Sequence, residues 1–129
     1  MFSLMHAGRV IEERLETALN AVGLSVPKFS VLSQLVSERE PLPLSELANR
    51  LSCVRSNITQ LVDRLEADGL VRRVDDPADR RSVRAELTPS GRQRHAAGEL
   101  AVERVQSRFV AELVESDRRA LGRVLAALE

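Results

Sequence analysis

The stretch "ELANRLSCVRSNITQLVDRLEADGLVRRV", residues 46–74, contains two short amphipathic patterns in direct succession. In the second pattern, apolar side chains recur at helical spacing from Ile58 to Leu65. Glycine readily adopts the left-handed conformation that ends many helices, so we predict that this helix stops just before Gly69. The first pattern, "ELANRL", predicts a shorter helix capped by Ser45, with a tight turn between the two helices.

A β-hairpin is predicted immediately after this pair of helices. The runs "LVRRVDD", 70–76, and "SVRAELT", 82–88, favour strands, and "PADRR" between them is suited to a charged tip. Two helices joined by a short turn and followed by a hairpin are typical of a winged helix-turn-helix, whose second helix lies in the major groove of DNA. We therefore predict a mainly α (α+β) fold, with residues 25–89 as the DNA-binding region.

The segments before this region predict two further helices and a strand. Helical spacing indicates a helix over about 3–22 that Gly23 ends. Ser25 is expected to cap a second helix, which has Pro27 in its first turn and runs to about residue 39. The two prolines of "PLPL", 41–44, restrict that segment to an edge strand or an extended link.

The C-terminal part of the chain predicts two more helices. Thr88 is expected to cap a long helix with Pro89 at its first position, and Ser116 to cap the last helix. Together with the first helix, the last one offers more apolar surface than a winged domain of about 60 residues can cover alone. A partner must therefore cover the two ends of the chain.

Composition limits the class of protein. With 129 residues, 43% of them hydrophobic and 29% charged, the chain is expected to form a single domain, 1–129. It has no apolar run long enough for a bilayer and no evident signal peptide, and one cysteine cannot form an internal disulfide. We therefore expect a cytoplasmic protein without membrane contact.

The charge distribution favours a nucleic-acid partner although the net charge is zero. Residues 50–94 contain ten arginines and seven acidic residues, and arginine is suited to bidentate contacts with phosphate and guanine. The alternative is that these arginines pair with the acidic residues of the same segment on a solvated face.

The outward face of the second helix is small and polar. With its apolar stripe turned inward, this face presents Ser56, Gln60 and Asp63, flanked by Asn57, Thr59 and Arg64. Asn and Gln can pair with adenine, and Arg55 in the first turn can reach guanine or phosphate. A solvated helix face without a ligand is the alternative interpretation.

The sequence resembles the MarR family of winged-helix repressors. The matching residues are "LSELANRL", 44–51, and "SNITQLVDRLEADGLVRRVDDPADRRSVRAELTPSGR", 56–92, in which "LVDRLEADGLV", "DPADRR" and "LTPSGR" have the family's order and spacing. The specific part of the resemblance covers about residues 44–94. It implies a homodimer whose N- and C-terminal helices interlock, a palindromic DNA operator, and repression that a small ligand or an oxidant relieves.

The resemblance also implies roles for particular residues. Asp79 and Arg81 match an Asp-x-Arg at the family's wing tip, where the carboxylate would orient the guanidinium for the minor groove; the alternative is a surface ion pair of little energetic weight. Residues 1–24 and 90–129 would be dimerisation helices. The DNA-binding residues that we predict are Ser45, Arg55, Ser56, Asn57, Thr59, Gln60, Arg64, Asp79, Arg80 and Arg81. The predicted dimerisation residues are Leu4, Ile11, Leu15, Phe109, Leu113, Leu121, Val124, Leu125 and Leu128.

One departure from the family concerns the start of the second helix. Relatives usually have a Ser or Asp cap where this chain has Val54, so Ser52 or Ser56 would have to cap the helix, or its end would fray. Cys53, in the same turn, matches a small apolar position, which favours a structural role over a redox one.

The sequence lacks the residue patterns that other classes of function need. His6 and His95 have no second ligand at metal-binding spacing, and the six glycines form no phosphate-binding or dinucleotide fingerprint, so we predict no metal, no cofactor and no enzyme. The better rival is a winged helix that binds only another protein, without sequence-specific DNA binding. Because Phe2, Phe29 and Phe109 are the only aromatic residues besides the histidines, a pocket for a small-molecule effector would be mostly aliphatic.

Overall fold

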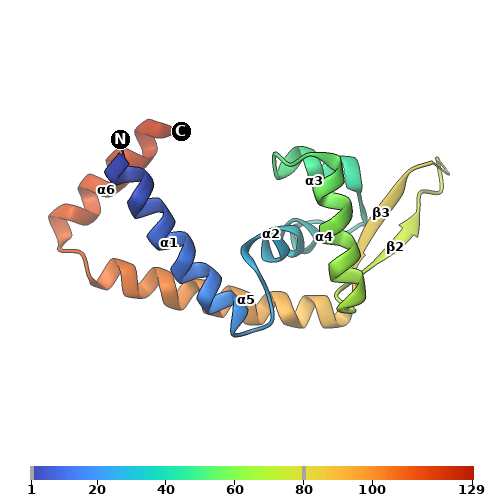
Figure 1. Cartoon of the computed structure of the whole chain (residues 1–129), viewed down its shortest axis with the longest axis horizontal. Helices are drawn as coiled ribbons and strands as arrows, with labels where there is room; N and C mark the ends of the chain where they lie inside the picture. The colour runs from blue at the N-terminus through green and yellow to red at the C-terminus, as the bar shows by residue number, and fades with distance from the viewer. Residues whose placement is uncertain (1, 80) are drawn as a thin grey trace.

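The computed structural model describes residues 2–79 and 81–129 of the chain. Within them a long helix, α5 (Pro89–Ala111), extends from one end of the molecule towards the other (Figure 1). At one end of α5 lie α2 (Val26–Ser37), α3 (Leu44–Arg50), α4 (Arg55–Ala67) and a small sheet; at the other end lie α1 (Phe2–Asn20) and α6 (Glu115–Leu128). This arrangement confirms the predicted mainly α winged helix-turn-helix with helical extensions at both ends.

The sheet has three antiparallel strands in the order β1-β3-β2. Strands β2 (Val71–Asp75) and β3 (Val83–Leu87) form the predicted hairpin, which projects from the body as a wing (Figure 1). β1 (Leu42–Pro43) pairs with β3 at the edge, where the missing N–H of a proline is tolerated. Of the two alternatives predicted for "PLPL", an edge strand or an extended link, the structure shows the edge strand.

Several predicted helix ends are confirmed by their hydrogen bonds. Gly23 and Gly69 have φ angles of +77° and +75°, the left-handed conformation that ends α1 and α4. The Ser25 side chain accepts a hydrogen bond from the Lys28 N–H at 3.2 Å and caps α2. Thr88 caps α5 in the same way, and its hydroxyl also donates to the Gly69 carbonyl at 2.7 Å, which ties the end of α4 to the start of α5.

Other predicted caps are wrong. α3 begins at Leu44, because this side chain enters the core, so Ser45 is already inside the first turn. α6 begins at Glu115, one residue before Ser116. Neither Ser52 nor Ser56 caps α4: its N-cap is Val54, without a side-chain hydrogen bond. Ser52 instead has φ +51° and ends α3, where the Cys53 N–H donates to the Ala48 carbonyl at 2.9 Å.

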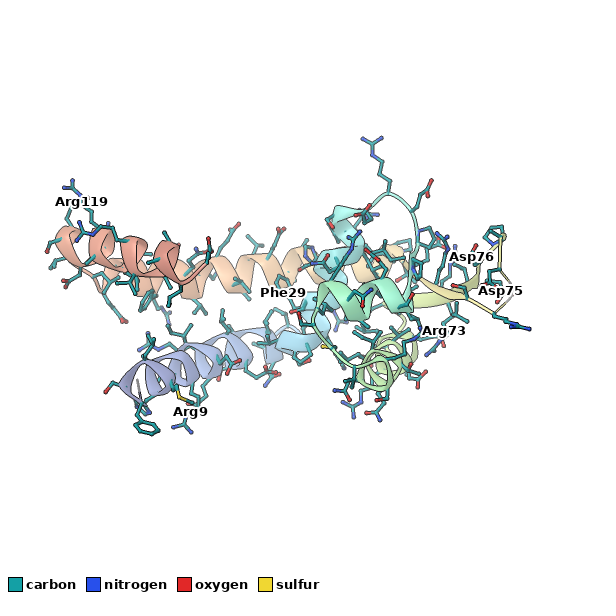
Figure 2. All side chains as sticks on the ribbon, turned by 90° about the horizontal axis from the view of Figure 1, so that it is seen from above. Arg9, Phe29, Arg73, Asp75, Asp76 and Arg119 are labelled. Atoms are coloured by element: carbon teal, nitrogen blue, oxygen red, sulfur yellow. The ribbon has the colours of Figure 1, made fainter. Side chains whose placement is uncertain are left out.

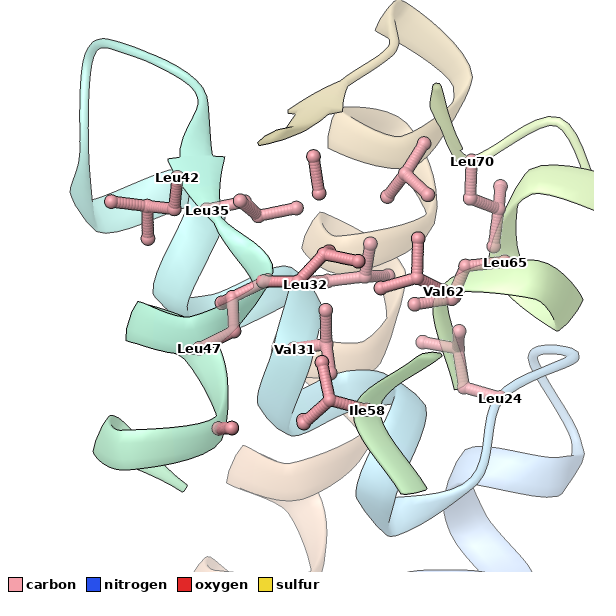
Figure 3. Packing of buried hydrophobic residues seen from close by; sticks show 14 of the residues in the cluster. Leu24, Val31, Leu32, Leu35, Leu42, Leu47, Ile58, Val62, Leu65 and Leu70 are labelled. Carbon is pink, nitrogen blue, oxygen red and sulfur yellow. The ribbon is translucent and has the colours of Figure 1, made fainter. Parts of the chain in front are cut away.

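The core lies between α2, α3, α4 and the sheet (Figure 3). Ile58, Val62 and Leu65 turn the predicted inner face of α4 into it, and each is fully buried. Leu61 of α4 and Val36 of α2 are only half-buried, whereas Val31 of α2 is fully buried. α2 is surrounded by α1, α4, α5 and the sheet, so it buries a broader face than one stripe.

The helices at the far end are much less buried. α6 has no buried residue, and α1 buries only Leu19. In the described part of the chain, no helix has the length and apolar character that crossing a membrane requires. The exposed large apolar side chains of this end include Phe2, Leu4, Met5, Val110, Val114, Val124, Leu125 and Leu128.

Candidate nucleic-acid interface

The exposed face of α4 contains most of the predicted DNA-contacting residues. Because Ile58, Val62 and Leu65 fix the opposite side in the core, this face cannot rotate inward. Thr59 is half-buried, and its hydroxyl donates to the Arg55 carbonyl at 3.0 Å, so it can offer only its acceptor lone pairs to a ligand. The predicted residues that are exposed on α4 are Arg55, Ser56, Asn57, Gln60 and Arg64.

Ser45 lies on a different helix from this face. It is exposed in the first turn of α3, which precedes α4 in the helix-turn-helix. The turn between the helices is held by backbone hydrogen bonds from Ser52 to Asn49 and from Cys53 to Ala48. Ser45 and the α4 face are therefore parts of one rigid helix pair.

The wing is anchored by a network around Asp76. This carboxylate accepts the Ala78 N–H at 2.9 Å and the Arg84 Nη2 at 3.0 Å, and Arg84 Nη1 donates to the Pro41 carbonyl at 3.3 Å. The Ala78 N–H, helped by Arg84, holds the pKa of Asp76 below its usual value against the opposing effect of burial. The ionised carboxylate thus fixes the turn at the wing tip to the body of the sheet.

The wing-tip pair has a different contact from the expected one. Asp79 Oδ1 accepts the main-chain N–H of Arg81 at 2.9 Å, whereas the family resemblance implied that it would orient the Arg81 guanidinium. This is an Asx turn, which orders the backbone of a short loop. The carboxylate therefore sets the position from which the exposed Arg81 side chain leaves the loop. Arg80, also predicted to bind DNA, lies outside the described residues.

The arginines of segment 50–94 divide into two groups. Within the described part of the chain, those that pair with acidic side chains are Arg50, Arg72, Arg73 and Arg84. Those that take part in no such pair there are Arg55, Arg64, Arg81, Arg92 and Arg94. Neutralisation by acidic residues of the same segment thus applies to Arg72, Arg73 and Arg84. In the described part of the chain, the charges of Arg55, Arg64 and Arg81 stay available for DNA.

The ion pair between Arg73 and Asp63 was not predicted from the sequence. Asp63 was placed on the outward face of α4, but its carboxylate binds the Arg73 guanidinium of β2. Figure 2 labels Arg73 where the wing meets α4. The period-two alternation of a strand could have suggested this contact, because Arg73 shares a face of β2 with the buried Val71.

The predicted dimerisation residues are among the least covered apolar side chains. Leu4, Ile11, Val124, Leu125 and Leu128 are exposed in the single chain. The remaining ones, half-buried, are Leu15, Phe109, Leu113 and Leu121. Exposed apolar side chains that lie together on a protein surface are typical of contact surfaces.

A cavity of about 670 Å³ lies between α1 and α5. Its lining includes the apolar side chains of Val10, Ala18 and Val105, and the Arg14–Glu112 ion pair, 3.4 Å long, lies at its edge. None of the three phenylalanines is part of the lining. The cavity wall is thus aliphatic and charged.

Cys53 and the histidines lie apart from one another. Cys53 is half-buried against the core, and its thiol donates to the Leu51 carbonyl at 3.4 Å. His95 is buried between α5 and α2, while His6 is exposed on α1. Within residues 2–79 and 81–129 no three His, Cys, Asp or Glu side chains come together as metal ligands do.

Comparison with known proteins agrees with this geometry. The family model described as the MarR family matches residues 24–83. The uncharacterized HTH-type transcriptional regulator YsmB of Bacillus subtilis is 37% identical over 89 residues, which are 69% of this chain and only 60% of that relative's length.

Many solved structures resemble nearly the whole chain, among them two named transcriptional regulators. The transcriptional repressor CouR of Rhodococcus jostii RHA1, bound to a 23-mer DNA duplex, is 31% identical with a TM-score of 0.88, and the match covers 98% of this chain and 89% of CouR. The PcaV transcriptional regulator from Streptomyces coelicolor, in complex with its natural ligand, is 25% identical with a TM-score of 0.78, over 95% of this chain and 89% of PcaV. With the helix-turn-helix, the arginine-bearing wing and the flanking helices in place, the chain belongs to the MarR family.

Proposed function

We propose that the protein is a sequence-specific DNA-binding transcriptional repressor that acts as a homodimer. The observation that supports this most directly is the combination of an exposed polar face on α4 with a wing that presents Arg81. Asn57 and Gln60 would contact base edges in the major groove, and Arg81 would enter the adjacent minor groove. Arg55 and Arg64, which pair with no acidic side chain in the described part of the chain, would contact phosphates or guanine.

In this proposal the chain has two functional parts. Residues 25–89 bind DNA, and residues 1–24 and 90–129 form the dimer. The exposed apolar side chains of α1 and α6 support a second copy as the partner, because a two-fold contact covers the same patch on both subunits. Two recognition helices related in this way would bind a palindromic operator.

A small-molecule effector is the remaining partner. PcaV, whose fold the chain shares, is described in complex with its natural ligand. The cavity between α1 and α5 supports a similar arrangement here, because a ligand in it would contact both the N-terminal helix and the helix that leads to the DNA-binding region. Its aliphatic and charged lining fits an apolar ligand with one polar group better than a stacked phenol.

The proposal is a binding function that requires no catalytic step, and it implies that the protein works in the cytoplasm, in contact with DNA. The rival function, a winged helix that binds only protein, would favour an apolar outer face on α4. The exposed residues of that face are instead polar or charged, from Arg55 to Arg64. This composition favours DNA.

Binding to the DNA around the gene that encodes the protein tests the proposal. We expect nanomolar protection of an inverted repeat and an affinity that falls steeply with salt, as phosphate neutralisation requires. An unrelated duplex of the same length is the control, and it should bind at least about 1,000-fold more weakly. Equal affinity for both duplexes, or no salt dependence, would exclude the proposed function in favour of a protein partner.

A further inference from the structure

Adjacent arginines on β2 have different environments. The Arg72 side chain is 64% exposed and pairs across the hairpin with Glu86 at 2.9 Å. Arg73, one residue later, points to the other face of the sheet, and its side chain is 25% exposed. Arg72 therefore forms its ion pair within the wing, whereas Arg73 forms its ion pairs with α4.

Arg73 is bound to α4 at several points. Its Nη1 lies 3.1 Å from Glu66 Oε1, its Nη2 contacts Asp63 Oδ1, and the same Nη2 donates to the Thr59 carbonyl at 3.4 Å. The Arg73 main-chain N–H also donates to Glu66 Oε2 at 2.9 Å. One residue of the wing is thus joined by its backbone and its side chain to about two turns of α4.

This contact connects the two structures that the proposed function directs at DNA. The α4 face and the wing tip must reach neighbouring grooves at the same time, so the angle between them determines whether both contacts form. Exposed ion pairs add little to folding stability, but a planar guanidinium held by two carboxylates has a defined orientation. The network of Asp76, Arg84 and Pro41 holds the wing to the sheet, and Arg73 is the link from the wing to α4.

We propose that Arg73 is a positioning residue that fixes the wing against α4, so that Arg81 and the α4 face contact DNA together. This inference rests on the proposed function. The rival role for Arg73 is a direct phosphate contact. Two carboxylates already neutralise its charge, which favours positioning.

A double-mutant cycle separates these roles. Arg73→Met should weaken operator binding about 10-fold, the size of one lost groove contact. Because the misplaced wing no longer uses Arg81, Arg81→Ala should add less than about 2-fold in the Arg73→Met protein, although it costs about 10-fold alone. Arg72→Met is the matched control and should change affinity by less than about 2-fold.

Glu66→Gln should change operator affinity in opposite directions under the two possible roles of Arg73. If Arg73 positions the wing, the loss of a carboxylate that accepts both its main-chain N–H and its guanidinium should weaken operator binding. If Arg73 contacts a phosphate, removing a negative charge beside it should strengthen binding. The positioning role would be overturned if Glu66→Gln bound the operator more tightly. It would also be overturned if the fold-losses of operator affinity caused by Arg73→Met and Arg81→Ala multiplied in the double variant.

Hydrogen exchange of the DNA-free protein tests the contact independently of DNA binding. Amides of β2 and β3 should exchange faster in Arg73→Met than in Arg72→Met, while those of the α4 core side stay protected. Unchanged exchange in the wing would overturn the inference whatever the protein binds. If the unmodified protein binds no duplex DNA, the proposed function fails; if it binds and only the Arg73 effects are missing, the positioning role alone fails.

Discussion

His95 of α5 lies face to face with Phe29 of α2, with ring centroids 5.1 Å apart and ring planes 5° from parallel. The imidazole Nε2 is 3.0 Å from the Ser33 hydroxyl, so the ring contacts α2 through both its face and its Nε2 edge. Gly98, one turn further along α5, permits this approach, because a Cβ there would lie 2.8 Å from the Phe29 ring. This contact joins the long helix α5 to α2, the helix that precedes the helix-turn-helix.

Acid should weaken this contact. Burial lowers the pKa of His95, and nearby Arg92 acts in the same direction while Glu99 opposes it. The unfolded chain then takes up a proton at about pH 6.5, before the folded protein does, so the free energy of unfolding is largest above this pH and falls as pH drops through the folded pKa. Urea unfolding should show a lower free energy of unfolding at pH 5.0 than at pH 7.5, and His95→Gln should make this difference smaller. The control is His6→Gln, which changes an exposed histidine and should behave like the unmodified protein. An equal difference in the unmodified protein and both variants would contradict the prediction.

Local signals in the sequence predicted much of this fold. Ser25, Thr88, Gly23 and Gly69 were correctly placed at helix ends, because a cap depends on a few neighbouring residues. Ser45 failed as a cap because the burial of Leu44, a tertiary effect, starts α3 one residue earlier. The same limit applies to the candidate site: the α4 face followed from helical periodicity, whereas the Arg73 contact depends on how the hairpin packs against α4.

The α4 face should determine sequence preference. Asn57→Ala and Gln60→Ala remove exposed side chains that can pair with base edges, without touching the buried side of α4. Each should weaken binding to the operator by about 1 to 3 kcal/mol while leaving most of the salt-dependent binding to random duplex. Fluorescence anisotropy with both duplexes measures the ratio of the affinity for the operator to the affinity for random DNA. Equal losses on both would make these residues phosphate contacts or structural supports.

The junction between α4, β2 and α5 should tolerate no side chain at Gly91. A Cβ there would overlap the Leu70 carbonyl oxygen and lie 2.8 Å from Leu87 Cδ1, and backbone cannot move aside as a flexible side chain can. Gly91→Ala should therefore lower the free energy of unfolding by about 2 kcal/mol, although alanine favours a helix. The neighbouring exposed Ser90→Ala is the control and should stay within about 0.5 kcal/mol. Wild-type stability of Gly91→Ala in urea would show that α5 can shift at this point.

The predicted dimer depends on α6, which has no buried residue in the single chain. Leu125 is 53% exposed and Leu121 is half-buried on the same face, so a partner subunit would cover both. Leu121→Glu combined with Leu125→Glu would place two charges in the interface between the subunits, so this variant should sediment as a monomer at micromolar concentration. The monomers should bind the operator weakly, because without the dimer contact nothing holds two α4 helices about 34 Å apart on one face of DNA. A matched variant, Arg119→Glu combined with Arg123→Glu, changes charge on the exposed side of α6 and should remain dimeric. The dimer model is wrong if the unmodified protein sediments as a monomer, or if the leucine double variant still binds its operator with wild-type affinity.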